Sequence, residues 1–169
     1  MLPVNIDRAS KGRVGLAMLI CGLILLSLLS GCGATDRQKG VYDDVAEISS
    51  EGDTYSYGSQ LGGVTQDGGL EKSFSRFNGM DTVWTFSVKE EGNVTIHYDQ
   101  EVYKGKFKLV AVDPDQMVNV LSEGTAKGDN VLHVKKGTYR IKLVGNGAKA
   151  KINISIEADE GIEVDVTGK

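Results

Sequence analysis

Trp84-Thr85-Phe86-Ser87-Val88 decides the fold class of this 169-residue chain, because apolar and polar side chains alternate strictly along it. Successive side chains of a β-strand point to opposite faces of the sheet, so the alternation predicts a strand with one buried face. Trp84 shares its phase with Phe86 and Val88, which favours a core position over an exposed ring that stacks on sugars. We therefore expect Trp84 in the core of a β-sheet protein.

The same period of two recurs from Leu70 onward. The clearest further segments are 94–98, 107–111, 139–143 and 152–156, and weaker ones are 71–77, 117–121, 131–134 and 162–166. Turn-forming residues separate them at 78–79, 91–93, 113–115, 123–124, 127–130, 136–137 and 145–147. Because no stretch shows a helical apolar period, we expect an all-β fold: one antiparallel, jelly-roll-like β-sandwich of about eight strands over residues 70–169.

Residues 32–69 differ from the rest of the chain in composition: they are polar, rich in glycine and rich in carboxylates. This composition predicts a flexible tether, which at about 37 residues would reach roughly 30–36 Å. One part is an exception. Residues 41–48 are compatible with a helical turn or two, and Tyr55 with Tyr57 fits a short strand, so part of the tether would dock on the domain.

The N-terminus carries a targeting signal. Three basic residues precede an apolar run over 14–29, and Leu29-Ser30-Gly31-Cys32 follows at its end. A basic head, a short apolar run and small residues at the cleavage point are typical of a secretory signal. This arrangement resembles the lipobox of bacterial lipoproteins. The resemblance implies cleavage before Cys32, a diacylglyceryl thioether on its sulfur, and a protein anchored on the extracytoplasmic face of the cell membrane.

Two alternatives to the lipid anchor remain open. An uncleaved membrane anchor is one, although the apolar run of 16 residues falls short of the roughly 20 that span a bilayer. Secretion after cleavage by a general signal peptidase is the other, because Gly33 and Ala34 are also small. With cleavage before Cys32, the chain divides into a signal peptide at 1–31, the tether at 32–69 and the sandwich at 70–169.

Charge narrows the class of partner. The chain has 19 basic and 23 acidic residues, and removing 1–31 leaves 16 basic and 22 acidic. An acidic surface argues against nucleic acid and against close contact with anionic lipid headgroups. Because Cys21 leaves with the signal and Cys32 carries the lipid, no disulfide can stabilise the folded domain.

The sandwich segment also resembles known modules, on the motifs Trp84-Thr85-Phe86-Ser87-Val88, Gly92-Asn93-Val94-Thr95-Ile96 and Lys136-Gly137-Thr138-Tyr139-Arg140-Ile141. They are similar to strands of pre-peptidase C-terminal modules and of carbohydrate-binding modules. Many sandwiches share these motifs, so the resemblance implies a fold and leaves the function open.

Candidate ligand-binding residues are Tyr98, Tyr103 and Tyr139, whose rings would be available to a glycan. Asp113 and Asp115 offer oxygens of the kind that calcium prefers, but Asp-Pro-Asp is also an ordinary tight turn, which we favour. His97 and His133 lack metal-ligand spacing and are expected on the outer face of a sheet. No residue pattern predicts a catalytic site, a metal site or a cofactor.

Basic residues in outward phase suggest a charged face built from Lys106, Lys108, Arg140 and Lys142. Edge protection and solubility are the favoured explanation, because lysine commonly serves both. The alternative is a docking face for an anionic partner or for the chain's own acidic tether.

These observations together predict a membrane-tethered, non-catalytic binding or scaffolding module at the cell surface. Its expected ligands are a cell-wall or dietary glycan, or an envelope protein. An accessory subunit of a membrane sensor or transporter, docked through the basic face, is the alternative. A glycan-active enzyme is a third reading, which would need two facing carboxylates in a cleft.

Overall fold

The structure is a computed structural model that describes residues 33–166, and from Ala34 onward these residues belong to one compact unit. Its elements in chain order are α2 (Asp36–Gly40), the 3₁₀ turn η1 (Val41–Asp43), α3 (Val45–Ser49), β1 (Thr54–Ser56), β2 (Ser59–Val64), β3 (Leu70–Val88), β4 (Gly92–Val112), β5 (Val118–Glu123), β6 (Ala126–Val134), β7 (Gly137–Ala158) and β8 (Ile162–Val166). The all-β class and the antiparallel, sandwich-like arrangement are confirmed.

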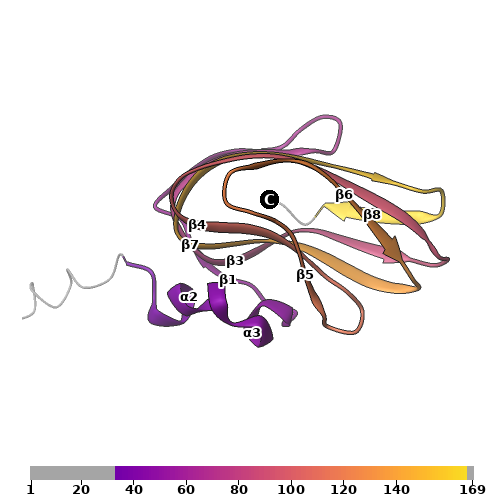
Figure 1. Cartoon of the computed structure of the whole chain (residues 1–169), viewed down its shortest axis with the longest axis horizontal. Coiled ribbons are helices and arrows are strands. Elements are labelled where there is room, and N and C mark those ends of the chain that lie inside the picture. Colours follow the sequence, from indigo (N-terminus) through magenta and orange to yellow (C-terminus); the bar gives the residue numbers. More distant parts are fainter. Residues whose placement is uncertain (1–32, 167–169) are drawn as a thin grey trace, which may run out of the picture. The chain divides into compact units, whose positions relative to one another are not determined.

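The two layers of the sandwich come from one sheet that folds over on itself (Figure 1). β3, β7 and β4 are neighbours in that order, and each is long enough, at 19 to 22 residues, to run through both layers. We call the layer that contains β2 and β6 the first half-sheet, and the layer that contains β1, β5 and β8 the second half-sheet. The strands bend between the two halves, and the opposite end of the sandwich is open.

Glycines mark the bend. The pairing of β3 with β7 shifts register between Phe77 and Gly79, and Gly79 adopts a φ of 103°. A Cβ on Gly79 would lie 1.9 Å from the carbonyl oxygen of Thr54, so only glycine fits there. The other two bent strands, β4 and β7, also carry glycines with positive φ, namely Gly105 and Gly147.

This bend corrects part of the turn prediction. Residues 78–79 and 145–147, predicted as turns, are bends inside β3 and β7, and residues 127–130 lie inside β6. The predicted turns near 91–93, 113–115 and 136–137 do separate strands. Glycine with asparagine serves a turn and a strand bulge equally well, so the local sequence does not distinguish the two.

The main core lies between the two half-sheets. Its largest side chains are Phe77, Trp84, Phe86 and Phe107, each with 0% of its surface exposed. Phe74, Phe77 and Phe107 contact one another with ring centroids 5.2–6.5 Å apart. The prediction that Trp84 belongs to the core is confirmed.

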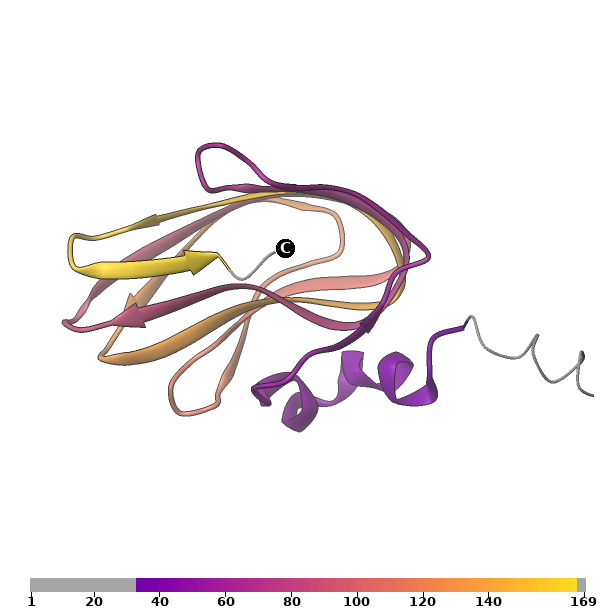
Figure 2. The same ribbon diagram turned by 180° about the vertical axis from the view of Figure 1, so that it is seen from behind.

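A second apolar cluster lies on the outer face of the second half-sheet, beneath the helical N-terminal segment. Val41, Tyr42 and Ile48 are at most 3% exposed there. They pack on strand residues Met80, Val110, Val112 and Val144, which point away from the main core. Figures 1 and 2 show α2 and α3 along this one face of the sheet.

The structure therefore differs from the expected flexible tether. Residues 36–64 hold two helices, a 3₁₀ turn and two strands, so regular structure extends beyond the two exceptions expected at 41–48 and at Tyr55 with Tyr57. Of the two tyrosines, Tyr55 lies in β1 and Tyr57 directly follows it. The reason is that the second half-sheet is apolar on both faces around Met80, Val110, Val112 and Val144, and this part of its outer face needs a cover. Helices of five residues are unstable alone, so this packing holds them, together with the Thr35–Gln38 capping box and the Asp44 cap.

Candidate functional site

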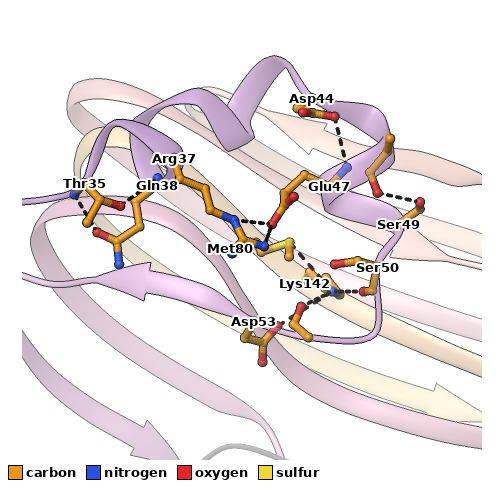
Figure 3. A network of polar contacts seen from close by, with 12 residues as sticks. Thr35, Arg37, Gln38, Asp44, Glu47, Ser49, Ser50, Asp53, Met80 and Lys142 are labelled. Atoms are coloured by element: carbon orange, nitrogen blue, oxygen red, sulfur yellow. Dashed lines mark hydrogen bonds and ion pairs between the residues drawn. The ribbon is translucent and has the colours of Figure 1, made fainter.

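Lys142 lies at the centre of a polar network under the N-terminal segment (Figure 3). Its side chain is 0% exposed, and its Nζ donates to the carbonyl oxygens of Ser50, at 2.7 Å, and Gly52, at 3.2 Å. A carboxylate oxygen of Asp53 lies 3.7 Å away. Burial lowers the pKa of Lys142, while Asp53 acts in the opposite direction. The ammonium group thus links residues 50–53, which follow α3, to β7 of the sheet.

The other three residues of the predicted basic face also contact this segment. Arg140 donates to the carbonyl oxygen of Ser49 and to the side chain of Gln116, both at 2.8 Å. The Nζ atoms of Lys106 and Lys108 lie 5.4 and 4.5 Å from the centre of the Tyr42 ring, within the range of a cation–π contact. The chain's own N-terminal segment therefore covers much of the predicted basic face. The favoured explanation, outward residues that protect an edge or aid solubility, is wrong for Arg140 and Lys142, which are 9% and 0% exposed because this segment packs on them.

The three candidate tyrosines are in different environments. Tyr139 is 5% exposed and its ring stacks on Phe86, with centroids 5.1 Å apart. Tyr98 is half-buried against the main core. Tyr103 is 59% exposed, and its hydroxyl donates to Glu101. The structure does not bring the three rings together on one surface.

A groove of about 520 Å³ opens between the half-sheets at the open end of the sandwich. This volume is within the range of sites for small ligands. Its floor includes Ala111 and Val134, which are buried. Polar groups along its walls come from both half-sheets: Asn93, Asp113, Asn119, His133, Lys135 and Tyr139. Of the candidate residues chosen from the sequence, Asp113 and Tyr139 meet here.

The groove exists because the connections at this end cross from one half-sheet to the other. β3 ends in the second half-sheet and β4 begins in the first, where Gly92 pairs with Val134. The Asp159 carboxylate accepts the Asn93 N–H at 2.7 Å and so supports one wall. Asn119, on β5, and Asn93 were not predicted from the sequence as groove residues, because Asn119 belongs to no motif and Asn93 only to a turn and strand motif.

Asp113 and Asp115 form the tight turn that the sequence analysis favoured. The Asp113 carboxylate accepts the backbone N–H groups of Asp115 and Met117, at 2.9 and 2.8 Å, and Asp115 pairs with Lys135. Over residues 33–166, no group of three or more His, Cys, Asp and Glu side chains is arranged to hold a metal ion. Calcium binding at this turn therefore gains no support.

His97 and His133 both have exposed surface, as expected for an outer sheet face, and His133 lies at the open end of β6, where it also borders the groove. The Nδ1 of His97 lies 2.5 Å from a carboxylate oxygen of Asp129, and its Nε2 lies 3.6 Å from Glu157. The hydrogen bond to Asp129 is the main cause of a raised pKa for His97. His97 lies outside the groove, which His133 lines.

One polar cluster was not foreseen. The hydroxyl of Tyr57 donates to Asp81 at 2.6 Å, and the Nζ of Lys72 lies 3.0 Å from the same carboxylate. Lys72 and Asp81 are only 12% and 14% exposed, and burial together with Asp81 raises the pKa of Tyr57 far above its usual value. The cluster ties the chain after β1 to β3, and nothing about its spacing in the sequence suggested it.

Cys32, the predicted lipidation site, lies outside the described residues. Among the helices over residues 33–166, none has the length and apolar character needed to cross a membrane. Comparison of the sequence with protein-family models and with curated proteins finds no match.

Proposed function

We propose that this protein is a lipid-anchored, extracytoplasmic binding module that holds its ligand in the groove at the open end of the sandwich. The anchor rests on the lipobox at 29–32, and the ligand site rests on the groove itself. The observation that carries the proposal is that the groove and the N-terminal start of the folded unit lie at opposite ends of the sandwich. Lys39 of α2 contacts the bend, whereas the groove is formed at the open end.

The chemistry of the lining favours a polar ligand such as a glycan fragment. Amide, imidazole, ammonium and carboxylate groups can donate to and accept from sugar hydroxyls. The role is non-catalytic. The Asp113 carboxylate already serves its turn, and the Asp115 carboxylate is paired with Lys135.

The accessory-subunit alternative placed a partner on the basic face. A partner cannot reach Arg140 and Lys142 on that face, because residues 49–53 cover both side chains. No further observation favours this alternative, and we do not propose it.

The anchor is tested by Cys32→Ala in a bacterial host, with Cys21→Ala as the matched control. We expect the wild type and Cys21→Ala to gain the mass of the lipid and to sediment with membranes. Cys32→Ala should do neither. Unchanged mass and fractionation of Cys32→Ala would contradict the anchor.

The groove is tested by co-sedimentation with purified peptidoglycan and by binding to an array of soluble glycans. We expect Asn119→Ala and His133→Ala to weaken binding at least tenfold. Asn153→Ala, an exposed residue of β7 outside the groove, should bind like the wild type. If the wild type binds no glycan, or if the groove variants bind as well as Asn153→Ala does, the proposed ligand site is wrong.

A further inference from the structure

The bend of the sandwich carries a group of exposed basic side chains, which we call the basic rim: Lys39, Lys104, Lys106 and Lys149. Lys104 pairs with Lys149 across β4 and β7, and Lys106 pairs with Asn146. The side chain of Asn146 donates to the backbone carbonyl of Lys39, which places α2 beside the same bend.

Little negative charge neutralises the basic rim. Within residues 33–166, Lys104, Lys106 and Lys149 form no ion pair, and Lys39 pairs only with the fully exposed Asp36, at 3.5 Å. Glu101 lies nearby and accepts from Tyr103. Tyr103 itself is exposed, with Lys149 positioned 5.9 Å from its ring centre, so an amphipathic aromatic accompanies the lysines.

The open end has the opposite character. Carboxylates concentrate in and around its turns at Glu90, Glu91, Glu157, Asp159, Glu160 and Glu163. Two of the lysines found there are paired, Lys89 with Glu163 and Lys135 with Asp115. Although the sequence has a net negative charge, its charges are unevenly distributed. Exposed basic side chains gather at the bend and acidic side chains at the open end.

The position of the lipid determines which end of the sandwich lies near the membrane. Thr35, the N-cap of α2, is three positions after Cys32 in the sequence. Three residues of extended chain span roughly 10 Å, which is comparable to the distance over which surface charges act in physiological salt. A lipid on Cys32 would thus hold the bend, and not the open end, close to the headgroups.

We propose that the basic rim lies on the membrane surface and binds anionic phospholipid headgroups, which orients the module so that its groove opens away from the bilayer. Lysines beside a lipid anchor supply the second attraction that fixes such an orientation. This inference rests on the lipid anchor of the proposed function.

The test uses the acylated protein in two kinds of vesicle, pure phosphatidylcholine and phosphatidylcholine with 30% phosphatidylglycerol. Lysines are labelled with a water-soluble amine reagent and quantified by mass spectrometry. With phosphatidylglycerol, we expect labelling of the basic rim to slow at least threefold, and labelling of Lys89, Lys127 and Lys136 to stay unchanged. Because the attraction is electrostatic, high salt should abolish the protection.

A matched pair of variants separates orientation from folding. K104E/K106E/K149E should lose the protection of Lys39, whereas K89E/K127E/K136E should retain it. Equal labelling of the basic rim in both vesicles would overturn the inference, and so would protection in native membranes but not in vesicles, which would indicate a different partner. Failure of the anchor is distinguishable, because the protein would then lack the lipid mass and would not be recovered with neutral vesicles.

Discussion

The ammonium group of Lys142 lies 2.7 Å from the backbone carbonyl oxygen of Ser50, although the two residues are 92 positions apart in the sequence. This contact joins β7 to the chain that follows α3. It explains why a lysine tolerates complete burial, since carbonyl oxygens and Asp53 replace the water that the ammonium loses.

Lys142→Met tests the importance of this contact for stability. The variant keeps most of the side-chain volume but leaves the carbonyl oxygens of Ser50 and Gly52 without their donor. We expect the free energy of unfolding to fall by about 1–3 kcal/mol, measured by urea denaturation. Lys151→Met, on the exposed part of β7, is the control and should change stability by less than about 0.5 kcal/mol. A neutral Lys142→Met would show that the donor contributes nothing to docking.

Ile48→Ala tests whether the N-terminal segment is part of the folded unit. Ile48 is 0% exposed and belongs to the second apolar cluster, so its truncation should cost about 2–5 kcal/mol or release the segment. Limited proteolysis should then cut between residues 40 and 53 much faster than in the wild type. Val45→Ala, in the same helix but with 60% of its surface exposed, should be cut at the wild-type rate. Equal cutting of the wild type and Ile48→Ala would indicate an undocked segment.

Gly79→Ala tests the bend. The added Cβ would collide with the carbonyl oxygen of Thr54, and the φ of 103° disfavours any side chain. We expect a loss of about 2 kcal/mol or more in thermal or urea unfolding. Gly63→Ala in β2 meets no atom within 4 Å and should be near neutral. Similar stability of the two variants would mean that the bend does not require glycine.

His97 makes stability depend on pH. Its pKa in the folded state is raised, chiefly by the hydrogen bond to Asp129, so the folded state holds the proton more tightly than the unfolded state. The resulting stabilisation is fully present below the unfolded pKa of about 6.5 and is lost as pH rises through the folded value. Urea unfolding of the wild type and His97→Gln should therefore differ more at pH 5.5 than at pH 8.5. Asp129→Asn should lower the pKa of His97 in an NMR titration, and an unchanged value would refute this account.

The alternation of residues such as Trp84, Phe86 and Val88 predicted the strands, the buried phase and the antiparallel class, because these depend on local periodicity. The bends were mistaken for turns at 78–79 and 145–147. Whether a glycine pair ends a strand or bends it depends on which strand lies alongside, and that information is not local.

A signal for the docked segment was present in the sequence. Val110, Val112 and Val144 fall on the phase opposite to Phe107, Leu109 and Leu143, so that part of the sheet is apolar on both faces and requires a cover. The groove had no such signal. Asn93 and Asn119 come from different strands, and Tyr139 was chosen for its ring and not for its neighbours.

The sequence by itself determined the strand content, the burial of Trp84 and the lipobox pattern at 29–32. Each of these depends only on side chains that are a few residues apart in the sequence. Only the tertiary structure decided that one sheet folds into two layers, that Lys142 fastens residues 50–53, and that basic and acidic side chains gather at opposite ends. These features depend on strand pairings between residues tens of positions apart, whose register is set by packing across the whole sheet.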